Sequence, residues 1–280
     1  MVSFIYHKTM SSVSIIIPVY KKLNEFSQYL QHNIQFFGDC EIIFVNDDPK
    51  TYLPKDIPTI DFGNRKVVWI NHQENQGFAR SVNDGATQAT GEYLFLLNTD
   101  VRLLDDSWRN VLPEFTNNSN LFAVSFAQKE KDGRVVGRNE IYFKDGLFHH
   151  RTLPFDSALS TQDSALLPTA WAEGGSTIIR KSMWGELHGF DESYSPFYWE
   201  DVDLSYRAKQ RGWQVFFVPG IVVEHHHEST IGTEYAKSQV NEIAFRNQLY
   251  FTNKFAQGFQ RIEYFIFRYI LLPLQKIKRA

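Results

Sequence analysis

The sequence predicts an α/β fold with a Rossmann-like, mostly parallel central sheet flanked by helices. Three observations support this fold class. Several continuous apolar runs rich in β-branched residues are typical of strands buried on both faces. Segments with apolar residues three or four positions apart, typical of helices, separate these runs. Polar residues follow several of the runs, as they do at the carboxyl ends of strands in open α/β sheets.

The first 100 residues alternate between predicted strands and helices. Strands are expected at VSIIIPV (13–19), EIIFVND (41–47), KVVWI (66–70) and within GEYLFLLNTD (91–100). One helix is expected after the first strand, with apolar residues at 23, 26, 30, 34 and 37, and a second over 77–90. This alternation predicts a parallel sheet.

The pattern changes beyond residue 120. Apolar runs at 121–127, 141–148 and 175–180 predict mixed or antiparallel strands, and an irregular loop is expected at about 150–170. WQVFFVPGIVVEHHH (213–227) predicts two short strands around a Pro-Gly turn. Residues 233–280 predict helices, with Pro273 as a break.

Composition excludes several classes of protein. A net charge of −3 gives no electrostatic support for nucleic-acid binding. The single cysteine, Cys40, excludes an intramolecular disulfide and a cysteine-based zinc site, and we expect a buried, inert thiol. Residues 1–12 show no secretory signal, and the longest apolar stretch, 264–274, is too short to span a bilayer. We expect a cytoplasmic protein, either soluble or peripheral on the inner face of the cell membrane.

Polar residues at the strand ends define the expected ligand site. The first strand ends at Pro18-Val19-Tyr20, the second at Asn46-Asp47-Asp48 and the fourth at Asn98-Thr99-Asp100. Ligands of open α/β sheets bind outside the carboxyl ends of the strands, so these residues are expected to line a nucleotide crevice. Neither a GxxxxGK[ST] loop nor a strand followed by GxGxxG is present, which disfavours P-loop and dehydrogenase readings.

Four separated stretches together resemble one family. They are SIIIPVYKKLNEF (14–26), NHQENQGFARSVNDGATQATGEYLFLLNTD (71–100), GGSTIIRKSMWGELHGFDESY (174–194) and YWEDVDLSYRAKQRGW (198–213). They resemble family 2 of the inverting nucleotide-sugar glycosyltransferases, which have the GT-A fold. They are similar to bacterial rhamnosyl- and galactosyltransferase-like enzymes of surface polysaccharide assembly. The resemblance implies a catalytic domain over 12–230 and a helical C-terminal extension over 231–280.

The resemblance implies roles for the strand-end residues. Asp100 matches the last acid of a DXD-type motif, which would hold Mg²⁺ or Mn²⁺ against the diphosphate of a UDP-, dTDP- or GDP-sugar. Asn98 replaces an acid in that motif and is a candidate contact to the ribose. Asp47 matches the carboxylate that accepts a hydrogen bond from the nucleobase, and Pro18 and Tyr20 border the same crevice. The alternative for each acid is an ordinary turn at a strand end.

The NQGFAR segment (75–80) places Gly77 at the start of a helix. Backbone N–H groups at a helix start favour phosphate or sugar hydroxyls, and Arg80 offers a fork of donors to an anionic diphosphate. A helix start followed by a surface arginine is the alternative.

The stretch FYWEDVDLSY (197–206) carries the predicted catalytic acids. The resemblance implies that Asp201 is the general base that deprotonates the acceptor hydroxyl, and that Glu200 orients the acceptor or Asp201. Asp203 is expected to be structural. Acidic residues also favour a first helical turn, so a plain helix start is the alternative. The neighbouring aromatic residues suit either a floor under a sugar ring or core packing; they are Phe197, Tyr198 and Trp199.

His225 follows Asp201 by 24 residues, a spacing at which some members of the resembled family carry a metal-ligating histidine. Strand alternation would place His227 on the same face. The alternative is that these histidines only pack or pair with Glu224 and Glu228.

The C-terminal segment is basic and aromatic. Such a helix suits an anionic membrane surface, a dimer interface, or packing on the catalytic domain. Against one acid, Glu263, the basic residues from position 246 onward are Arg246, Lys254, Arg261, Arg268, Lys276, Lys278 and Arg279.

Together these observations predict an inverting hexosyltransferase that uses a nucleotide-sugar donor and a glycan or lipid-linked glycan acceptor, in polysaccharide, O-antigen or capsule assembly. Two alternatives stay open. One is a non-catalytic glycan-binding or scaffold protein on the same fold. The other is a sugar nucleotidyltransferase, which is expected to carry a glycine-rich basic signature that SIIIPVYKKLNEF lacks.

Overall fold

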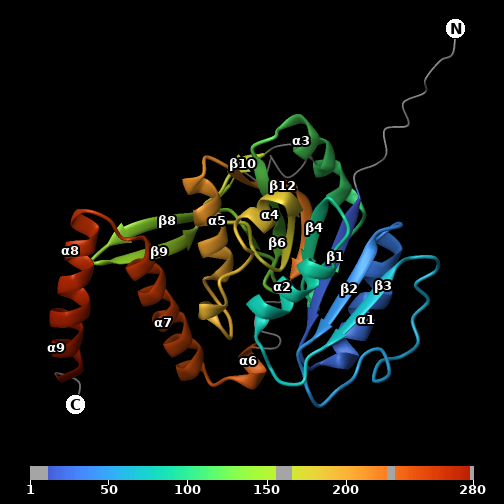
Figure 1. The fold of residues 1–280 in the computed structure, drawn as a ribbon, viewed down its shortest axis with the longest axis horizontal. Coiled ribbons are helices and arrows are strands. Elements are labelled where there is room, and N and C mark those ends of the chain that lie inside the picture. The colour runs from blue at the N-terminus through green and yellow to red at the C-terminus, as the bar shows by residue number, and fades with distance from the viewer. Residues whose placement is uncertain (1–11, 156–165, 226–230, 278–280) are drawn as a thin grey trace, which may run out of the picture.

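A computed structural model describes residues 12–155, 166–225 and 231–277 of the protein. A central sheet carries helices on both faces (Figure 1). The strands are β1 (Val13–Val19), β2 (Glu41–Asn46), β3 (Val67–Asn71), β4 (Tyr93–Leu97), β5 (Val101–Leu103), β6 (Leu121–Lys129), β7 (Val135–Val136), β8 (Asn139–Lys144), β9 (Leu147–Thr152), β10 (Leu167–Pro168), β11 (Ser176–Arg180) and β12 (Gln214–His225).

The helices alternate with these strands in the first part of the chain and gather at its C-terminal end. They are α1 (Leu23–Asn33), η1 (Ile34–Phe36), α2 (Phe78–Gln88), η2 (Ser107–Val111), α3 (Leu112–Asn117), α4 (Lys181–Glu186), η4 (Glu192–Tyr194), α5 (Glu200–Gln210), α6 (Ile231–Glu234), α7 (Lys237–Phe255), α8 (Phe259–Ile266), η5 (Phe267–Leu271) and α9 (Leu272–Ile277).

Within the described residues the main sheet has ten strands, in the order β10-β12-β6-β11-β4-β1-β2-β3, with β5 paired to β12 and β7 to β6. β3, β2, β1 and β4 are parallel, as the alternation of strands and helices predicts. β11 is antiparallel to both β4 and β6, and β6 is parallel to β12. The expectation of mixed strands beyond residue 120 is therefore confirmed.

The apolar run of β1 explains why the sheet is covered on both faces. Successive side chains of a strand point to opposite faces. Ile15 and Ile17 pack in the same core as Phe26 and Leu30 of α1, whereas Ile16 packs on the other face with residues of α2, α4 and α5. A strand buried on both sides in this way needs a continuous apolar sequence rather than an alternating one.

Two details differ from the sequence predictions for the later strands. Residues 213–227 were expected to form two strands around Pro219-Gly220, but β12 is one strand through this dipeptide, with a register shift against β6 between Val218 and Val222. A β-bulge absorbs the proline and glycine without ending the strand. The apolar run 141–148 forms two strands, β8 and β9, because the turn at Asp145-Gly146 reverses the chain.

Pro273 was expected to break the C-terminal helix, and this prediction is wrong. α8, η5 and α9 form one continuous helix from Phe259 to Ile277, and Pro273 lies near the start of α9. The five residues directly before α9, Phe267–Leu271, adopt π-helical geometry. The wider π turn alters the spacing of the backbone around the proline ring, which accommodates a residue that lacks an N–H group. The interruption lies earlier, at residues 256–258 between α7 and α8.

The helix α7 packs against the segment that carries the predicted catalytic acids. Phe251 and Phe255 of α7 share a buried cluster with Trp199 and Val202, which flank the predicted catalytic acids. None of the helices in the described ranges is long and apolar enough to cross a membrane.

Candidate active site

The α5 helix begins at Glu200, directly after two residues with left-handed backbone. Tyr198 has φ of 74° and Trp199 has φ of 78°. Bulky side chains rarely adopt positive φ, and each such residue costs on the order of 1–3 kcal/mol, so surrounding contacts must hold the turn. This turn sets the direction in which Glu200 and Asp201 leave the helix start.

Asn247 of α7 supplies these contacts. Its side-chain amide donates to the backbone carbonyls of Tyr194, Phe197 and Tyr198, at 2.7, 2.9 and 2.9 Å. Asn247 is only 1% exposed, so the amide has no access to water as an alternative partner. The C-terminal extension therefore holds the loop that precedes the predicted catalytic acids.

Asp201 is half-buried at this helix start. Its Oδ2 accepts a hydrogen bond from the Gly174 N–H at 3.2 Å, and its Oδ1 accepts from the Val202 N–H at 2.8 Å. Burial and the nearby charge of Glu173 raise the pKa of Asp201 to about 7. A carboxylate with this pKa can accept a proton near neutral pH.

Glu200 lies deeper, with 6% of its surface exposed. Its Oε2 is buried without a hydrogen-bond partner among the described residues. Burial and the neighbouring charge of Asp201 raise the pKa of Glu200 well above its ordinary value. The deeper burial of Glu200 favours its neutral form, so the two adjacent acids lie in different environments.

Asp203 is fully buried and belongs to a structural ion-pair network. Its carboxylate pairs with Arg207 one turn later and with Lys254 Nζ of α7 at 2.6 Å, and it accepts from the Tyr194 hydroxyl at 3.1 Å. The contacts agree with the structural role expected for Asp203.

Of the two roles considered for the aromatic residues before α5, core packing fits Phe197 and Trp199. Both are buried, and the centres of the Trp199 and Phe251 rings lie 5.0 Å apart.

Asp100 and His225, which the family resemblance implies as metal ligands, lie close together, and their role in metal binding stays a prediction. His225 ends β12 opposite Val101 of β5, which follows Asp100 in the chain. The distance from Asp100 Oδ1 to His225 Nε2 is 3.3 Å. Among residues 12–155, 166–225 and 231–277, no group of three or more His, Cys, Asp or Glu side chains could hold a metal ion. His227 lies outside the described residues.

Two buried polar residues orient the His225 ring. His225 Nδ1 lies 2.9 Å from Gln128 Oε1, and Gln128 Nε2 donates to the Ser176 hydroxyl at 3.0 Å. Because an amide oxygen only accepts, Nδ1 carries the proton and Nε2 is the ring nitrogen that faces Asp100. Outer contacts of this kind fix the ring of a metal-ligating histidine.

The Gly174-Gly175 dipeptide lies between Asp201, the predicted base, and the Asp100–His225 pair. Gly174 donates to Asp201, while a β-carbon on Gly175 would lie 2.9 Å from His225 Cε1 and 3.0 Å from Asn98 Nδ2. Only glycine permits such a close approach at residue 175. Asn98 Oδ1 is buried there without a partner in the described part of the chain. The fold thus brings the acids of α5 next to the end of β4.

Asp47 and Gly77 were both predicted to bind the donor nucleotide sugar, but in the structure they contact each other. Asp47 is buried, and its carboxylate accepts from the N–H groups of Gln76 and Gly77, each at 2.8 Å, and contacts His72 Nδ1 at 2.8 Å. Its role towards a nucleobase stays a prediction. The expectation that the Gly77 N–H is available to a ligand needs correction, because Asp47 occupies it. The next N–H, of Phe78, donates to the Pro196 carbonyl.

Arg80 stays a predicted diphosphate ligand, but its guanidinium has acidic partners in the protein. Its Nε donates to Asp84 at 2.8 Å, and a terminal nitrogen lies 3.5 Å from Glu192. Pro18 and Tyr20 lie half-buried at the end of β1, and their place in a nucleotide crevice stays a prediction. Lys21 Nζ lies 5.1 Å from the centre of the Tyr20 ring.

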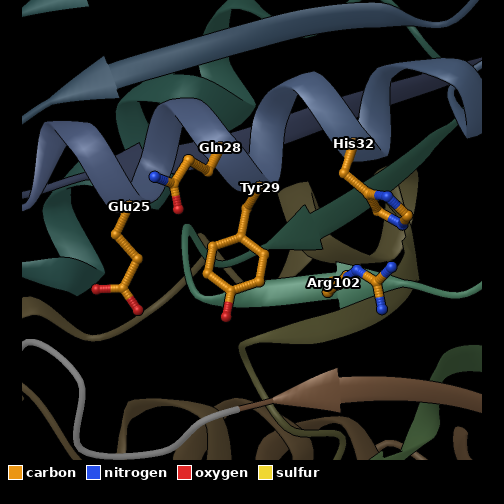
Figure 2. Close-up of a pocket in the computed structure, with 5 residues that line it drawn as sticks. All are labelled: Glu25, Gln28, Tyr29, His32 and Arg102. Atoms are coloured by element: carbon orange, nitrogen blue, oxygen red, sulfur yellow. The ribbon is translucent and has the colours of Figure 1, made fainter.

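A pocket of about 580 Å³ lies between α1 and β5 (Figure 2). Its lining contains none of the predicted site residues, and it consists of Glu25, Gln28, Tyr29, His32 and Arg102. Burial raises the pKa of Tyr29, and the charges of Glu25 and Asp100 add to this effect. The pocket is separate from the loop that carries Asp201.

Sequence reasoning missed three residues that shape the site. Glu173 acts on the pKa of Asp201, Gln128 orients His225, and Asn247 holds the turn before α5. Glu173 had one available signal, since it directly precedes the Gly174-Gly175 dipeptide in the resembled motif. Gln128 and Asn247 lie in ordinary strand and helix patterns, so their roles emerge only from tertiary contacts.

The fold agrees with the GT-A glycosyltransferase class that the sequence predicts. The sequence matches the model of glycosyl transferase family 2 over residues 14–183, and the chain belongs to that family. The matched range ends before Asp201 and His225. Family membership confirms the predicted class of enzyme and leaves the nucleotidyltransferase and non-catalytic alternatives without support.

Curated relatives include glycan-building enzymes. Over 67 residues the chain is 39% identical to the N-acetylglucosaminyl-diphospho-decaprenol L-rhamnosyltransferase of Mycobacterium tuberculosis, which covers 24% of this chain and 22% of that enzyme. Over 261 residues it is 23% identical to the low-salt glycan biosynthesis hexosyltransferase Agl10 of Haloferax volcanii, covering 91% of this chain and 80% of the other. The chain thus spans about a fifth of the length of the rhamnosyltransferase.

Solved structures confirm the fold. GalNAc-T7, in a crystal structure with UDP, GalNAc and Mn²⁺, superposes with a TM-score of 0.69 at 14% identity over 94% of this chain and 51% of the other. The mannosyltransferase PcManGT of Pyrobaculum calidifontis, in complex with GDP-Man and Mn²⁺, gives a TM-score of 0.59 at 12% identity over 92% of this chain and 70% of the other.

Proposed function

We propose that this glycosyltransferase moves a hexose, with inversion, from a UDP-, dTDP- or GDP-sugar to a hydroxyl of a glycan or lipid-linked glycan acceptor. The observation that carries the proposal is the Asp201 carboxylate, which combines partial exposure with a pKa raised to about 7 and lies beside the Gly174-Gly175 contact to the Asp100–His225 pair.

The proposed step is a single displacement. The acceptor oxygen attacks the anomeric carbon as its proton passes to the Asp201 carboxylate. The bond from the anomeric carbon to the diphosphate oxygen breaks, and the nucleoside diphosphate leaves with the electron pair. Attack from the face opposite the leaving group inverts the anomeric configuration. One protein carboxylate suffices, because the leaving diphosphate is already a stable anion.

The residues present fit a divalent cation. Asp100 offers a hard carboxylate oxygen, His225 Nε2 is held towards it, and the buried Asn98 Oδ1 lacks a protein partner among the described residues. Mg²⁺ and Mn²⁺ commonly use one or two protein oxygen ligands and complete their shell with substrate phosphates and water. A cation bound there would neutralise charge on the diphosphate.

The acceptor class rests on the relatives. Similarity to a rhamnosyltransferase that acts on a diphospho-decaprenol-linked sugar supports a lipid-linked glycan acceptor. Similarity over 211 and 121 residues to two poly-beta-1,6-N-acetyl-D-glucosamine synthases, and over 175 residues to an O-antigen biosynthesis protein of Myxococcus xanthus, supports polysaccharide or O-antigen assembly. A cytoplasmic location belongs to the same proposal.

A donor screen tests the function. UDP-, dTDP- and GDP-sugars would be added to the full chain with and without Mn²⁺, and thermal stabilisation and nucleoside diphosphate release would be recorded. We expect one nucleotide class to raise the melting temperature and to be turned over only with the cation. Folded protein that binds no donor in the presence of Mn²⁺ and candidate acceptors would contradict the proposal.

Titration of Mn²⁺ in the presence of a nucleoside diphosphate tests the metal pair separately from turnover. Asp100→Asn should weaken cation affinity at least about tenfold, since it removes the charged ligand. Asp132→Asn is the matched control, because Asp132 is an exposed aspartate that pairs with Arg134 at the surface. Equal Mn²⁺ affinity in both variants would exclude Asp100 as a ligand.

A further inference from the structure

The last helix of the protein carries a large exposed apolar surface. The continuous helix from Phe259 to Ile277 stands at one end of the molecule, beside α7 and away from β2 and β3 (Figure 1). We define its apolar face by the side chains that are 41–85% exposed: Phe259, Ile262, Phe265, Ile266, Tyr269, Ile270, Leu271 and Leu274. Single exposed apolar residues are ordinary, but a contiguous set of this size marks an interaction surface.

The apolar face lies on the side of the helix that the protein leaves uncovered. On the covered side, Tyr264 is buried and its hydroxyl donates to the Leu249 carbonyl of α7 at 3.3 Å. Phe267 packs against Gly146 in the turn between β8 and β9. The spacings of three and four residues through positions 259, 262, 266 and 269 keep the exposed residues together along the helix.

The excess of basic residues in this segment favours an anionic partner. Residues 259–280 contain five basic residues and one acidic residue, in a chain whose net charge is −3. Arg261 is an exposed residue of the same helix, and the Arg268 guanidinium lies 5.9 Å from the centre of the Tyr269 ring. Basic side chains bordering aromatic and aliphatic ones are the composition that anionic lipid headgroups attract. A second copy of the chain would bring the same positive charge to the contact, which opposes dimerisation.

We propose that the apolar face of the helix from Phe259 to Ile277 binds an anionic lipid surface. The helix lies in the plane of the interface, its apolar side chains enter the boundary between headgroups and acyl chains, and its arginines contact lipid phosphates. This inference does not depend on the identity of the donor or on the catalytic role of Asp201.

Vesicle flotation of the full chain tests the inference. Vesicles of phosphatidylcholine with phosphatidylglycerol would be compared with vesicles of phosphatidylcholine alone, at low and high salt. We expect the protein to float with the anionic vesicles and salt to weaken this binding, because the electrostatic part is screened. The triple variant Phe259→Ser, Phe265→Ser, Tyr269→Ser should lose at least about tenfold in partitioning.

A matched variant distinguishes lipid binding through the apolar face from nonspecific adsorption of other exposed apolar side chains. Tyr52→Ser with Leu104→Ser removes two exposed apolar side chains outside the C-terminal helices, 59% and 42% exposed, and should float like the unchanged protein. Melting temperatures of both variants show whether they fold. Absence of binding by the unchanged protein, or equal loss in both variants, overturns the inference. The inference is also overturned if the unchanged protein binds no lipid but forms a dimer in light scattering, and the triple variant does not form that dimer.

Discussion

Asp201 and Glu200 are adjacent in sequence but occupy different environments. Asp201 is half-buried and accepts two backbone hydrogen bonds, whereas Glu200 is buried with one oxygen unpartnered in the described part of the chain. Hydrogen bonds to the charged form limit the rise in the pKa of Asp201, and Glu200 has little such compensation. The two acids follow directly after the left-handed turn at Tyr198-Trp199.

The pKa of Asp201 predicts a pH dependence of catalysis. Burial and Glu173 raise this pKa to about 7, so the carboxylate is protonated and inactive as a base below that value. We expect kcat/KM to fall about tenfold per pH unit below about pH 6 and to reach a plateau above about pH 8. Initial rates across this range, with melting temperatures as a check on folding, provide the measurement. A flat profile through neutral pH would be incompatible with Asp201 as the base.

Glu200 predicts a pH dependence of stability. Because its pKa is raised in the native state, folded protein keeps a proton that the unfolded chain releases above about pH 4.3. The unfolded state then binds fewer protons, so the free energy of unfolding decreases as pH rises, by up to about 1.4 kcal/mol per pH unit. Glu200→Gln cannot titrate and should escape this loss.

Thermal denaturation of Glu200→Gln and of the unchanged protein checks this prediction. The advantage of the variant in melting temperature should grow from about pH 5 to about pH 8, by a few degrees per unit at most. A difference in melting temperature that stays constant across this range would show that Glu200 is ionised in the native state.

At the level of single residues, the sequence indicated that two candidate site residues would meet, but not which hydrogen bonds their neighbours would make. The juxtaposition of Asp100 and His225 followed from the family spacing, and the structure brings the two side chains within 3.3 Å. The occupation of the Gly77 N–H by Asp47 was not predictable, because it depends on how the loop before α2 returns to the end of β2. Hydrogen-bond partners distant in sequence leave no periodic signal.

Among the elements, α7 has an unexpected influence on the site. Asn247 donates to three carbonyls of the loop before α5, and Lys254 pairs with Asp191 at 2.7 Å and with Asp203. Although burial opposes it, these hydrogen bonds to carboxylates raise the pKa of Lys254, which stays charged. We therefore propose that the extension over 231–280 completes the catalytic domain over 12–230 rather than acting as a separate unit.

Asn247→Asp tests the role of α7. The substitution keeps the shape of the side chain. It replaces the Nδ2 amide, which donates to three backbone carbonyls, with a carboxylate oxygen that can only accept hydrogen bonds. We expect kcat to fall about 10- to 100-fold through misplacement of Asp201, with donor affinity nearly unchanged. Asn253→Asp, at an exposed position of the same helix, is the control and should keep full activity. A variant that loses thermal stability while kcat and its pH profile stay unchanged would limit Asn247 to a structural role.

Element types were predictable where one periodicity dominates. The apolar runs of β1, β2 and β4 and the helical spacing of α1 need no information from the rest of the chain. β12 and the C-terminal helix were not divided correctly, because Pro219-Gly220 and Pro273 were taken as breaks. In β12 a bulge against β6 absorbs the dipeptide, and in the helix a π turn precedes the proline, so tertiary pairing and local geometry override the breaker signal.

For the molecule as a unit, the GT-A topology explains why residues so far apart in sequence converge. β4 and β11 are neighbours, so the end of β4 with Asp100 lies beside the Gly174-Gly175 dipeptide that precedes β11. The same dipeptide contacts Asp201 at the start of α5 and His225 at the end of β12. The strand-end residues were expected to meet at one edge of the sheet, whereas the contacts of the Gly174-Gly175 dipeptide were not predicted.

The turnover of Asp201→Asn, measured with the donor that the screen identifies, is the decisive experiment. We expect kcat to fall by a factor on the order of 10² to 10⁴, because the amide cannot accept the acceptor proton, while donor affinity and melting temperature stay close to those of the unchanged protein. Full transfer activity in Asp201→Asn would contradict the assignment of Asp201 as the general base of this glycosyltransferase.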